Sequence, residues 1–145
     1  ENFKLACKDA KVDLQKIADY LRLKLPYLCN WQEAAFWLWL LRAWAENRMA
    51  VSFSENEILG VAVWRRIERA SDVFRIDVHV PCGRYLVVDE CAAEAPEAMG
   101  QMWEMVMAHQ QNVQEVIFER SKVRGHFSVY DKDKFSRRLK GIPHG

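Results

Sequence analysis

Hydrophobic side chains recur at helical spacing in three parts of the chain. In residues 12–25 apolar positions repeat on one side, and charged residues occupy the other side until Pro26 ends the pattern. Residues 32–47 carry Trp and Leu on nearly all sides, which predicts a helix buried on several faces. A third helix is expected over residues 96–110, because Pro96 suits a first helical turn.

β-strand patterns separate these helical segments. Residues 49–53 and 58–67 are largely apolar and flank a polar turn, so they predict an antiparallel hairpin. Residues 73–80 alternate apolar and polar side chains, which predicts a strand with one face in the core and one in water. Residues 85–88 are continuously apolar, which indicates a central strand, and this strand runs directly into Asp89.

The last part of the chain predicts two further strands, at residues 113–118 and 125–130, and a loosely held tail from about residue 131. The whole order is typical of an α+β domain with a mixed, mostly antiparallel sheet flanked by helices. A strand, a helix and a strand after an antiparallel meander favour the GNAT-like fold of acyl-CoA N-acyltransferases. The length fits a single domain over residues 1–145.

The composition indicates which classes of partner and which cellular compartment to expect. Lys plus Arg number 21 and Asp plus Glu number 20, so no overall field draws the chain to nucleic acid. The four cysteines form no CxxC pair and stand apart from the histidines, which predicts no metal site and favours free thiols in a cytoplasmic protein. No apolar run of membrane-spanning length and no secretory leader pattern occur, and the absence of an initiating Met is consistent with a longer gene product.

Four short segments occur in an order that is typical of one acyltransferase family. They are Pro26 followed by Asn30-Trp31 at the start of an apolar helix, the strand Val61-Ala62-Val63-Trp64, Asp89 followed by small residues and Pro96, and the segment Lys122-Val123-Arg124-Gly125-His126-Phe127-Ser128. Together they resemble the lysine acyltransferases that activate pore-forming RTX toxins. The likeness covers about residues 20–130 of the chain.

The resemblance implies transfer of a fatty acyl group from an acyl carrier protein to lysine side chains, on a GNAT-like fold. In that family a His in the helix-opening connector and an Asp at the end of the central strand form the catalytic pair. Asp89 matches the Asp, whereas the place of the His falls on or beside Leu28. The candidate catalytic residues are therefore Asp89, Cys29 as an acyl-accepting nucleophile, and His126 as a replacement base.

Each candidate also has a structural interpretation. Asp89 would then be a solvated or capping residue at a strand end, Cys29 an inert buried thiol, and His126 a solvated imidazole. The alternative function is accordingly a non-catalytic domain of the same fold that binds an acyl chain or a partner protein.

The donor site is expected between the central strand and the third helix. The candidate donor-binding positions are Val87, Val88, Ala98, Met99 and Gly100. The chain lacks the Q/R-x-x-G-x-G/A loop with which ordinary acetyl-CoA-dependent members of the fold bind pyrophosphate, and Glu94 and Glu97 would repel that group. No tightly bound cofactor is expected, and the donor is an acyl carrier protein or another acyl thioester such as acyl-CoA.

Two features bear on protein partners. Residues 122–140 are strongly basic, which is consistent with docking of an acidic carrier protein, with nucleic acid as a weaker alternative, and equally with a solvated tail that has no partner. Trp37, Trp39 and Trp44 stand at helical spacing and belong either in the core or in the contact of a homodimer.

Overall fold

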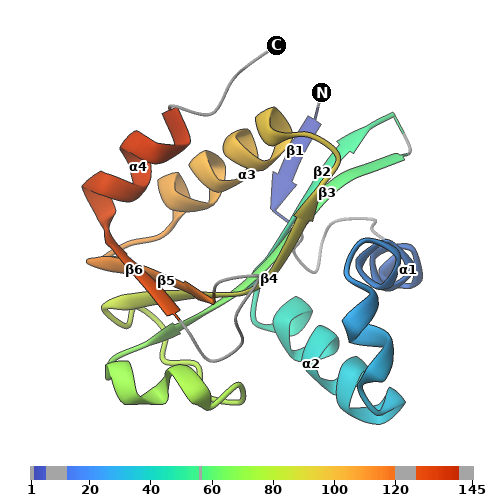
Figure 1. Ribbon diagram of the computed structural model, residues 1–145, viewed down its shortest axis with the longest axis horizontal. Coiled ribbons are helices and arrows are strands. Elements are labelled where there is room, and N and C mark those ends of the chain that lie inside the picture. Colours follow the sequence, from blue (N-terminus) through green and yellow to red (C-terminus); the bar gives the residue numbers. More distant parts are fainter. Residues whose placement is uncertain (1, 6–12, 56, 120–126, 141–145) are drawn as a thin grey trace.

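The computed structural model describes residues 2–5, 13–55, 57–119 and 127–140 (Figure 1). A six-stranded sheet runs through the middle, with its strands in the order in which they occur along the chain. Neighbouring strands are antiparallel except β4 and β5, which are parallel. The strands are β1 (Asn2–Leu5), β2 (Met49–Ser54), β3 (Glu57–Ile67), β4 (Tyr85–Ala93), β5 (Glu115–Glu119) and β6 (Phe127–Asp131).

Helices cover both faces of this sheet (Figure 1). On one face lie α1 (Leu14–Lys24), the 3₁₀-helix η1 (Pro26–Asn30) and α2 (Glu33–Ala45); on the other lie α3 (Pro96–His109) and α4 (Lys132–Lys140). No helix in the described ranges is both long and apolar enough to cross a bilayer.

Each helical layer packs on its own hydrophobic core, because alternate residues of a strand face opposite sides of the sheet. Val61 and Val63 of β3 pack toward α1 and α2, whereas Ala62 and Trp64 pack toward α3. The first core also contains Ile17, Leu21, Phe36 and Leu40, and the second contains Leu86, Met102, Trp103 and Val106.

Most predicted elements are confirmed. Local signals define the helix ends: Asp13 accepts a hydrogen bond from the Gln15 amide at the start of α1, and Pro96 occupies the first turn of α3. The hairpin forms as β2 and β3, and the apolar segment after Arg84 forms β4, which lies between β3 and β5. The predicted α+β class, with a mixed and mostly antiparallel sheet flanked by helices, is confirmed.

The prediction of a strand over residues 73–80 is wrong. A short 3₁₀-helix, η2 (Ala70–Phe74), occupies the start of this segment, and irregular backbone and turns follow. Arg65 explains the difference, because its guanidinium donates to the carbonyl oxygens of Asp72 and Val73 and so holds the backbone away from strand pairing. Most of the alternating apolar side chains stay outside the core: Phe74 is 73% exposed and Ile76 47%, whereas Val78 packs against the buried cluster that contains Ile67 and Val87.

The chain from residue 131 onward also differs from the prediction of a loosely held tail. Residues 132–140 form α4, and the carboxylate of Asp131 accepts a hydrogen bond from the Lys134 amide in its first turn. Phe135 and Leu139, one helical turn apart, are buried against α3. The structure does not describe residues 141–145.

Candidate functional site

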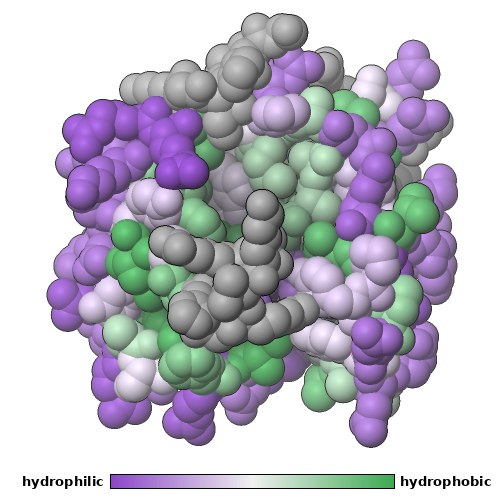
Figure 2. All heavy atoms as spheres, in the orientation of Figure 1, coloured by the Kyte–Doolittle hydropathy of each residue, from purple (hydrophilic) through white to green (hydrophobic). Residues whose placement is uncertain are grey.

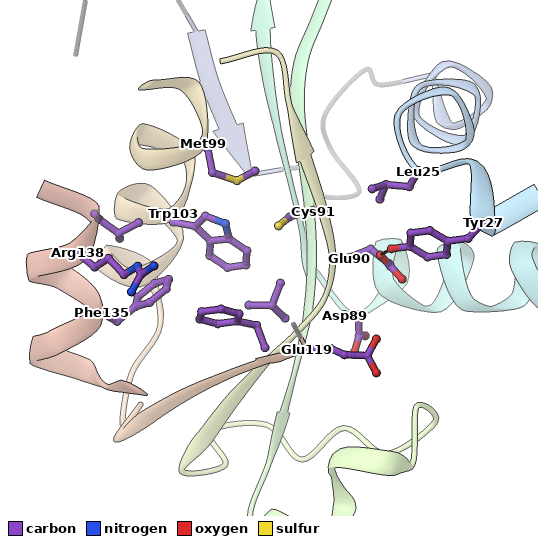
Figure 3. Close-up of a pocket in the computed structure, with 13 residues that line it drawn as sticks. Leu25, Tyr27, Asp89, Glu90, Cys91, Met99, Trp103, Glu119, Phe135 and Arg138 are labelled. Carbon is purple, nitrogen blue, oxygen red and sulfur yellow. Dashed lines mark hydrogen bonds between the residues drawn. The ribbon is translucent and has the colours of Figure 1, made fainter. Parts of the chain in front are cut away.

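The parallel pairing of β4 with β5 ends abruptly. The last paired residues are Val88 and Phe118, whereas β4 continues to Ala93 and is paired there with β3. Asp89 and Glu119 are thus the first residues beyond the last pair. A cavity of about 490 Å³ lies at this point, between β4, β5, α3, α4 and the connector after α1 (Figure 3). This volume lies within the range typical of small-ligand sites.

A β-bulge re-aims the side chains of β4 beside the cavity. Val88 lies opposite Trp64 and Glu90 opposite Val63, so Asp89 is an extra residue with no partner on β3. The alternation of β4 therefore shifts by one position. Asp89 and Glu90 both point toward the layer of α1 and α2, and Cys91 points back toward α3 (Figure 3).

The bulge gives the cavity two chemically different sides. The α3 and α4 side is mostly apolar and is lined by Val88, Cys91, Met99, Trp103, Phe118, Phe135 and Leu139, with the cationic Arg138 among them. The opposite side is lined by Leu25, Tyr27, Asp89, Glu90 and Glu119. A ligand that fills the cavity would contact hydrocarbon at one end and carboxylates at the other.

Asp89 lies on the floor of the acidic side. Its side chain is only 4% exposed, Arg65 Nε donates to its Oδ1 at 2.9 Å, and Arg48 Nη1 lies 3.8 Å from its Oδ2. Burial raises the pKa of Asp89, while the two arginines and the nearby Trp39 indole oppose the shift. Within the described part of the chain, neither Oδ2 of Asp89 nor Nε1 of Trp39 has a hydrogen-bond partner.

Glu90 occupies a different setting from its neighbour. The hydroxyl of Tyr27, in η1, donates a hydrogen bond to Oε2 of Glu90 and fixes this carboxylate at the wall of the cavity (Figure 3). Leu28, where the resemblance places a catalytic His, is fully buried in the core beneath α1 and α2. The connector therefore presents Tyr27 to the cavity, one residue before the expected position.

Cys91 lines the apolar side as a protonated thiol. Burial raises its pKa to about 11, the neighbouring charge of Glu90 adds to the shift, and a hydrogen bond with Trp103 opposes it. A thiol with such a pKa is a poor nucleophile at neutral pH, so Cys91 contributes shape and apolar surface.

The structure brings together only some of the residues predicted from sequence. Asp89, Val88 and Met99 line the cavity. Three other candidates do not line it: Val87 packs with Ile67 and Ile117 on the opposite side of β4 from Val88, and Ala98 and Gly100 are buried within α3.

The two other catalytic candidates have different outcomes. Cys29 is exposed in η1, with its Sγ 4.0 Å from the Arg22 carbonyl oxygen, and does not line the cavity. His126 lies outside the described residues. Across the described ranges, no group of three or more His, Cys, Asp or Glu side chains is placed to hold a metal ion.

Sequence reasoning missed Tyr27, Glu90, Arg48 and Arg65. For Tyr27 and Glu90 the available signal was their place in the sequence: Tyr27 directly precedes the expected His site, and Glu90 directly follows Asp89. The arginines carried no such signal, because each becomes part of the site only through the tertiary structure.

The start of α3 carries negative charge close to the expected donor site. Pro96 occupies its first turn and removes one backbone amide, no side chain caps the helix, and Glu97 lies in the first turn. Glu94 forms an ion pair with Lys24 Nζ at 2.6 Å and accepts a hydrogen bond from the Tyr20 hydroxyl at 3.0 Å. This helix start therefore lacks the free, positive character that binds a pyrophosphate.

No protein-family model and no curated protein sequence matches the chain. Solved structures do share its fold. The loading GNATL domain of CurA from Lyngbya majuscula superposes with a TM-score of 0.60 at 13% identity, over 81% of this chain and 63% of that one. The GphF GNAT-like decarboxylase in complex with isobutyryl-CoA superposes with a TM-score of 0.58 at 16% identity, over 81% of this chain and 65% of that one.

A putative acetyltransferase from Staphylococcus aureus Mu50 gives a TM-score of 0.51 at 15% identity, over 80% of this chain and 77% of that one. The chain spans less than two thirds of the length of the first two structures. At these identities the likeness concerns the fold and not the activity. The chain has a GNAT-like fold.

Proposed function

We propose that this domain transfers an acyl group from a thioester donor to an amine, in the cavity where β4 and β5 part. One observation carries the proposal: a single cavity joins an apolar side, suited to an acyl group, with a carboxylate side, suited to an amine. A structural neighbour of the same fold is in complex with isobutyryl-CoA, which is itself an acyl thioester.

The donor is assigned to the gap between the strands. Beyond Val88 no described strand pairs with the β5-facing edge of β4, and the amide groups of a pantetheine arm are assigned to this edge. The acyl group would then contact Met99, Trp103 and Leu139. Glu94 and Glu97 near the helix start disfavour a pyrophosphate, so the proposed donor is an acylated carrier protein rather than acyl-CoA.

The acceptor enters on the acidic side. Carboxylates at the cavity wall attract a lysine ammonium, and Glu90, held by Tyr27, accepts one of its protons. The neutral amine then attacks the thioester carbonyl carbon: the C–N bond forms, the C–S bond breaks, and the departing thiolate receives the second amine proton. Asp89 is assigned an orienting role, since Arg65 and Arg48 neutralise its charge on the floor of the site.

The same carboxylates argue against decarboxylation, the reaction named for one structural neighbour. A malonyl thioester would place its own carboxylate near Glu90 or Glu119, and like charges repel. An ammonium group would instead be attracted by these carboxylates.

One observation favours the competing function, a non-catalytic domain that binds an acyl chain or a protein. Asp89 is enclosed by Arg65, Arg48 and Trp39 in the manner of a structural carboxylate. In that case the cavity would bind the acyl thioester without turning it over.

A transfer experiment separates these functions. The protein is incubated with octanoyl-pantetheine and a lysine-containing peptide, and the peptide is analysed by mass spectrometry; a serine-containing peptide and malonyl-pantetheine serve as comparison substrates. The expected product is Nε-octanoyl-lysine, with little O-acylation and little decarboxylation. Binding of octanoyl-pantetheine by calorimetry without acylated peptide would instead support the non-catalytic domain.

A further inference from the structure

Helix α4 has two chemically distinct sides. Phe135 and Leu139 point inward and form part of the cavity wall, with exposed fractions of 6% and 4%. The helix also carries four exposed cationic residues: Lys132, Lys134 and Arg137 on the outward side, and Arg138, which also lines the cavity. Figure 2 shows the strongly hydrophilic patch that lies over α4.

The positive charge of α4 is not neutralised by the residues that the structure describes. Across the described ranges no Asp or Glu side chain forms an ion pair with any of its four cations. Arg138 instead donates to the Tyr130 hydroxyl at 2.9 Å and lies over the Tyr130 ring, which in turn stacks on Phe118. These contacts fix the helix at the cavity mouth and leave its positive charge available to a partner.

The patch is compact. Nine residues at about 1.5 Å per residue give α4 a length of roughly 13 Å. Asp133 lies within it, and the neighbouring helix α3 presents Glu104 to solvent. Nucleic-acid affinity grows with the number of phosphates that a surface neutralises, so an extended track would suit that ligand better than this short helix.

We propose that the outward side of α4 is the docking surface for an acidic protein that carries the acyl group on a flexible arm. The inference rests on the proposed function and adds the place where the donor binds. The helix that presents the cations is also a wall of the cavity, so a partner bound there holds its arm beside the entrance. Complementary charge would raise the association rate and orient the partner.

The test compares two donors with the full chain. Octanoylated bacterial acyl carrier protein is the docked donor, and octanoyl-pantetheine is the donor that needs no docking. The variant is Lys134→Glu/Arg137→Glu, because neither side chain lines the cavity. Its matched control is Lys16→Glu/Arg69→Glu, a double reversal at exposed sites on α1 and after β3.

The α4 variant is expected to raise the KM for the carrier-protein donor by at least roughly tenfold and to weaken the salt dependence of that KM. Its kcat/KM with octanoyl-pantetheine should equal that of the wild type, and the control variant should match the wild type with both donors. If the α4 variant and the control variant changed the KM for the carrier-protein donor equally, the proposal would be overturned.

A binding measurement keeps the docking surface testable if no transfer occurs. Fluorescence anisotropy of labelled, unacylated carrier protein should show binding that the α4 variant loses and the control variant retains. That result without transfer would support the docking surface while removing the acyltransferase function. Absence of binding, or a single-stranded RNA that displaces the carrier protein and itself binds through Lys134 and Arg137, would overturn the proposal.

Discussion

Arg65 and Asp89 form a buried ion pair: Nε of Arg65 donates to Oδ1 of Asp89 at 2.9 Å, and the two side chains are 3% and 4% exposed. The same guanidinium donates to the carbonyl oxygens of Asp72 and Val73. The carboxylate at the bulge of β4 is therefore linked, through Arg65, to the segment that follows β3. Because Arg65 binds both Asp89 and this backbone segment, we assign proton transfer to Glu90 and orientation to Asp89.

Replacement of Arg65 should be strongly destabilising. Arg65→Met leaves the Asp89 carboxylate buried with only the more distant Arg48, and breaking a buried pair in this way typically costs about 3–5 kcal/mol of unfolding free energy. Arg69→Met is the matched control, because Arg69 is 75% exposed and surface ion pairs contribute about 0–1 kcal/mol. Urea unfolding followed by tryptophan fluorescence measures both, and similar losses in the two variants would contradict the buried pair.

His79 should make stability depend on pH. Burial and the positive charge of Arg48 together lower the pKa of His79 to about 4, whereas an unfolded histidine titrates near 6.5. The unfolded chain thus holds the extra proton between these values, so the stabilising contribution is complete above about pH 6.5 and is lost as the pH falls toward 4.

The measurement for this prediction is the free energy of unfolding at a series of pH values. Nδ1 of His79 accepts from the Arg66 amide, and the side-chain oxygen of His79→Asn can replace that bond. The variant should therefore show a shallower fall between pH 6.5 and 4.5 than the wild type, and His109→Asn, at an exposed site in the last turn of α3, serves as the control. Parallel curves for His79→Asn and the wild type would show that another group is responsible.

Gly83 should tolerate no side chain. A Cβ at this position would lie 2.6 Å from the carbonyl carbon and oxygen of Ile67, which belong to the backbone and cannot rotate away. Gly83→Ala should cost about 2–3 kcal/mol of unfolding free energy, in the range of overpacked sites. At Gly60 the corresponding distance is 3.2 Å to the Ala92 carbonyl oxygen, so Gly60→Ala should cost less. The reverse order in denaturant unfolding would contradict the packing of the turn against β3.

The apolar side of the cavity should select the acyl chain. Each methylene buried there adds about 0.8 kcal/mol, so the affinity for acyl-pantetheine should rise about fourfold per methylene until the chamber is full. Leu139→Trp should flatten this dependence by filling the chamber, while acetyl-pantetheine binds as before. Calorimetry over a series of chain lengths measures the slope, with thermal unfolding to confirm that the variant folds. An unchanged slope would place the acyl chain elsewhere.

Local patterns were sufficient to predict much of the fold. α1, α2 and α3 follow from helical periodicity with Pro26 and Pro96 as boundaries, and the hairpin follows from two apolar segments around a polar turn. The error at residues 73–80 arises because an alternating pattern predicts a strand, whereas the Arg65 side chain, a few residues earlier, donates to the carbonyl oxygens of Asp72 and Val73. The pair Phe135 and Leu139, four residues apart, was a helical signal in the tail that high charge obscured.

The site depended on a feature that no local pattern reveals. In a regular strand Asp89 and Glu90 would face opposite sides of the sheet, and only the bulge at Asp89 turns both toward Tyr27 and Arg65. The sequence therefore pointed to Asp89 but not to Glu90, the second carboxylate of the site. Tyr27 was equally hidden, because a connector pattern does not tell which residue enters the cavity and which, like Leu28, enters the core.

The rate of lysine acylation by Glu90→Gln tests the central claim most directly. The measurement is kcat/KM for transfer from octanoyl-pantetheine to a lysine peptide, compared with the wild type and with Glu104→Gln, an exposed control on α3. The account predicts that the wild type acylates the peptide, that Glu90→Gln is slower by about 10²–10⁴-fold with its fold intact, and that Glu104→Gln matches the wild type. Equal rates for Glu90→Gln and the wild type, or no acylation by the wild type, would contradict it.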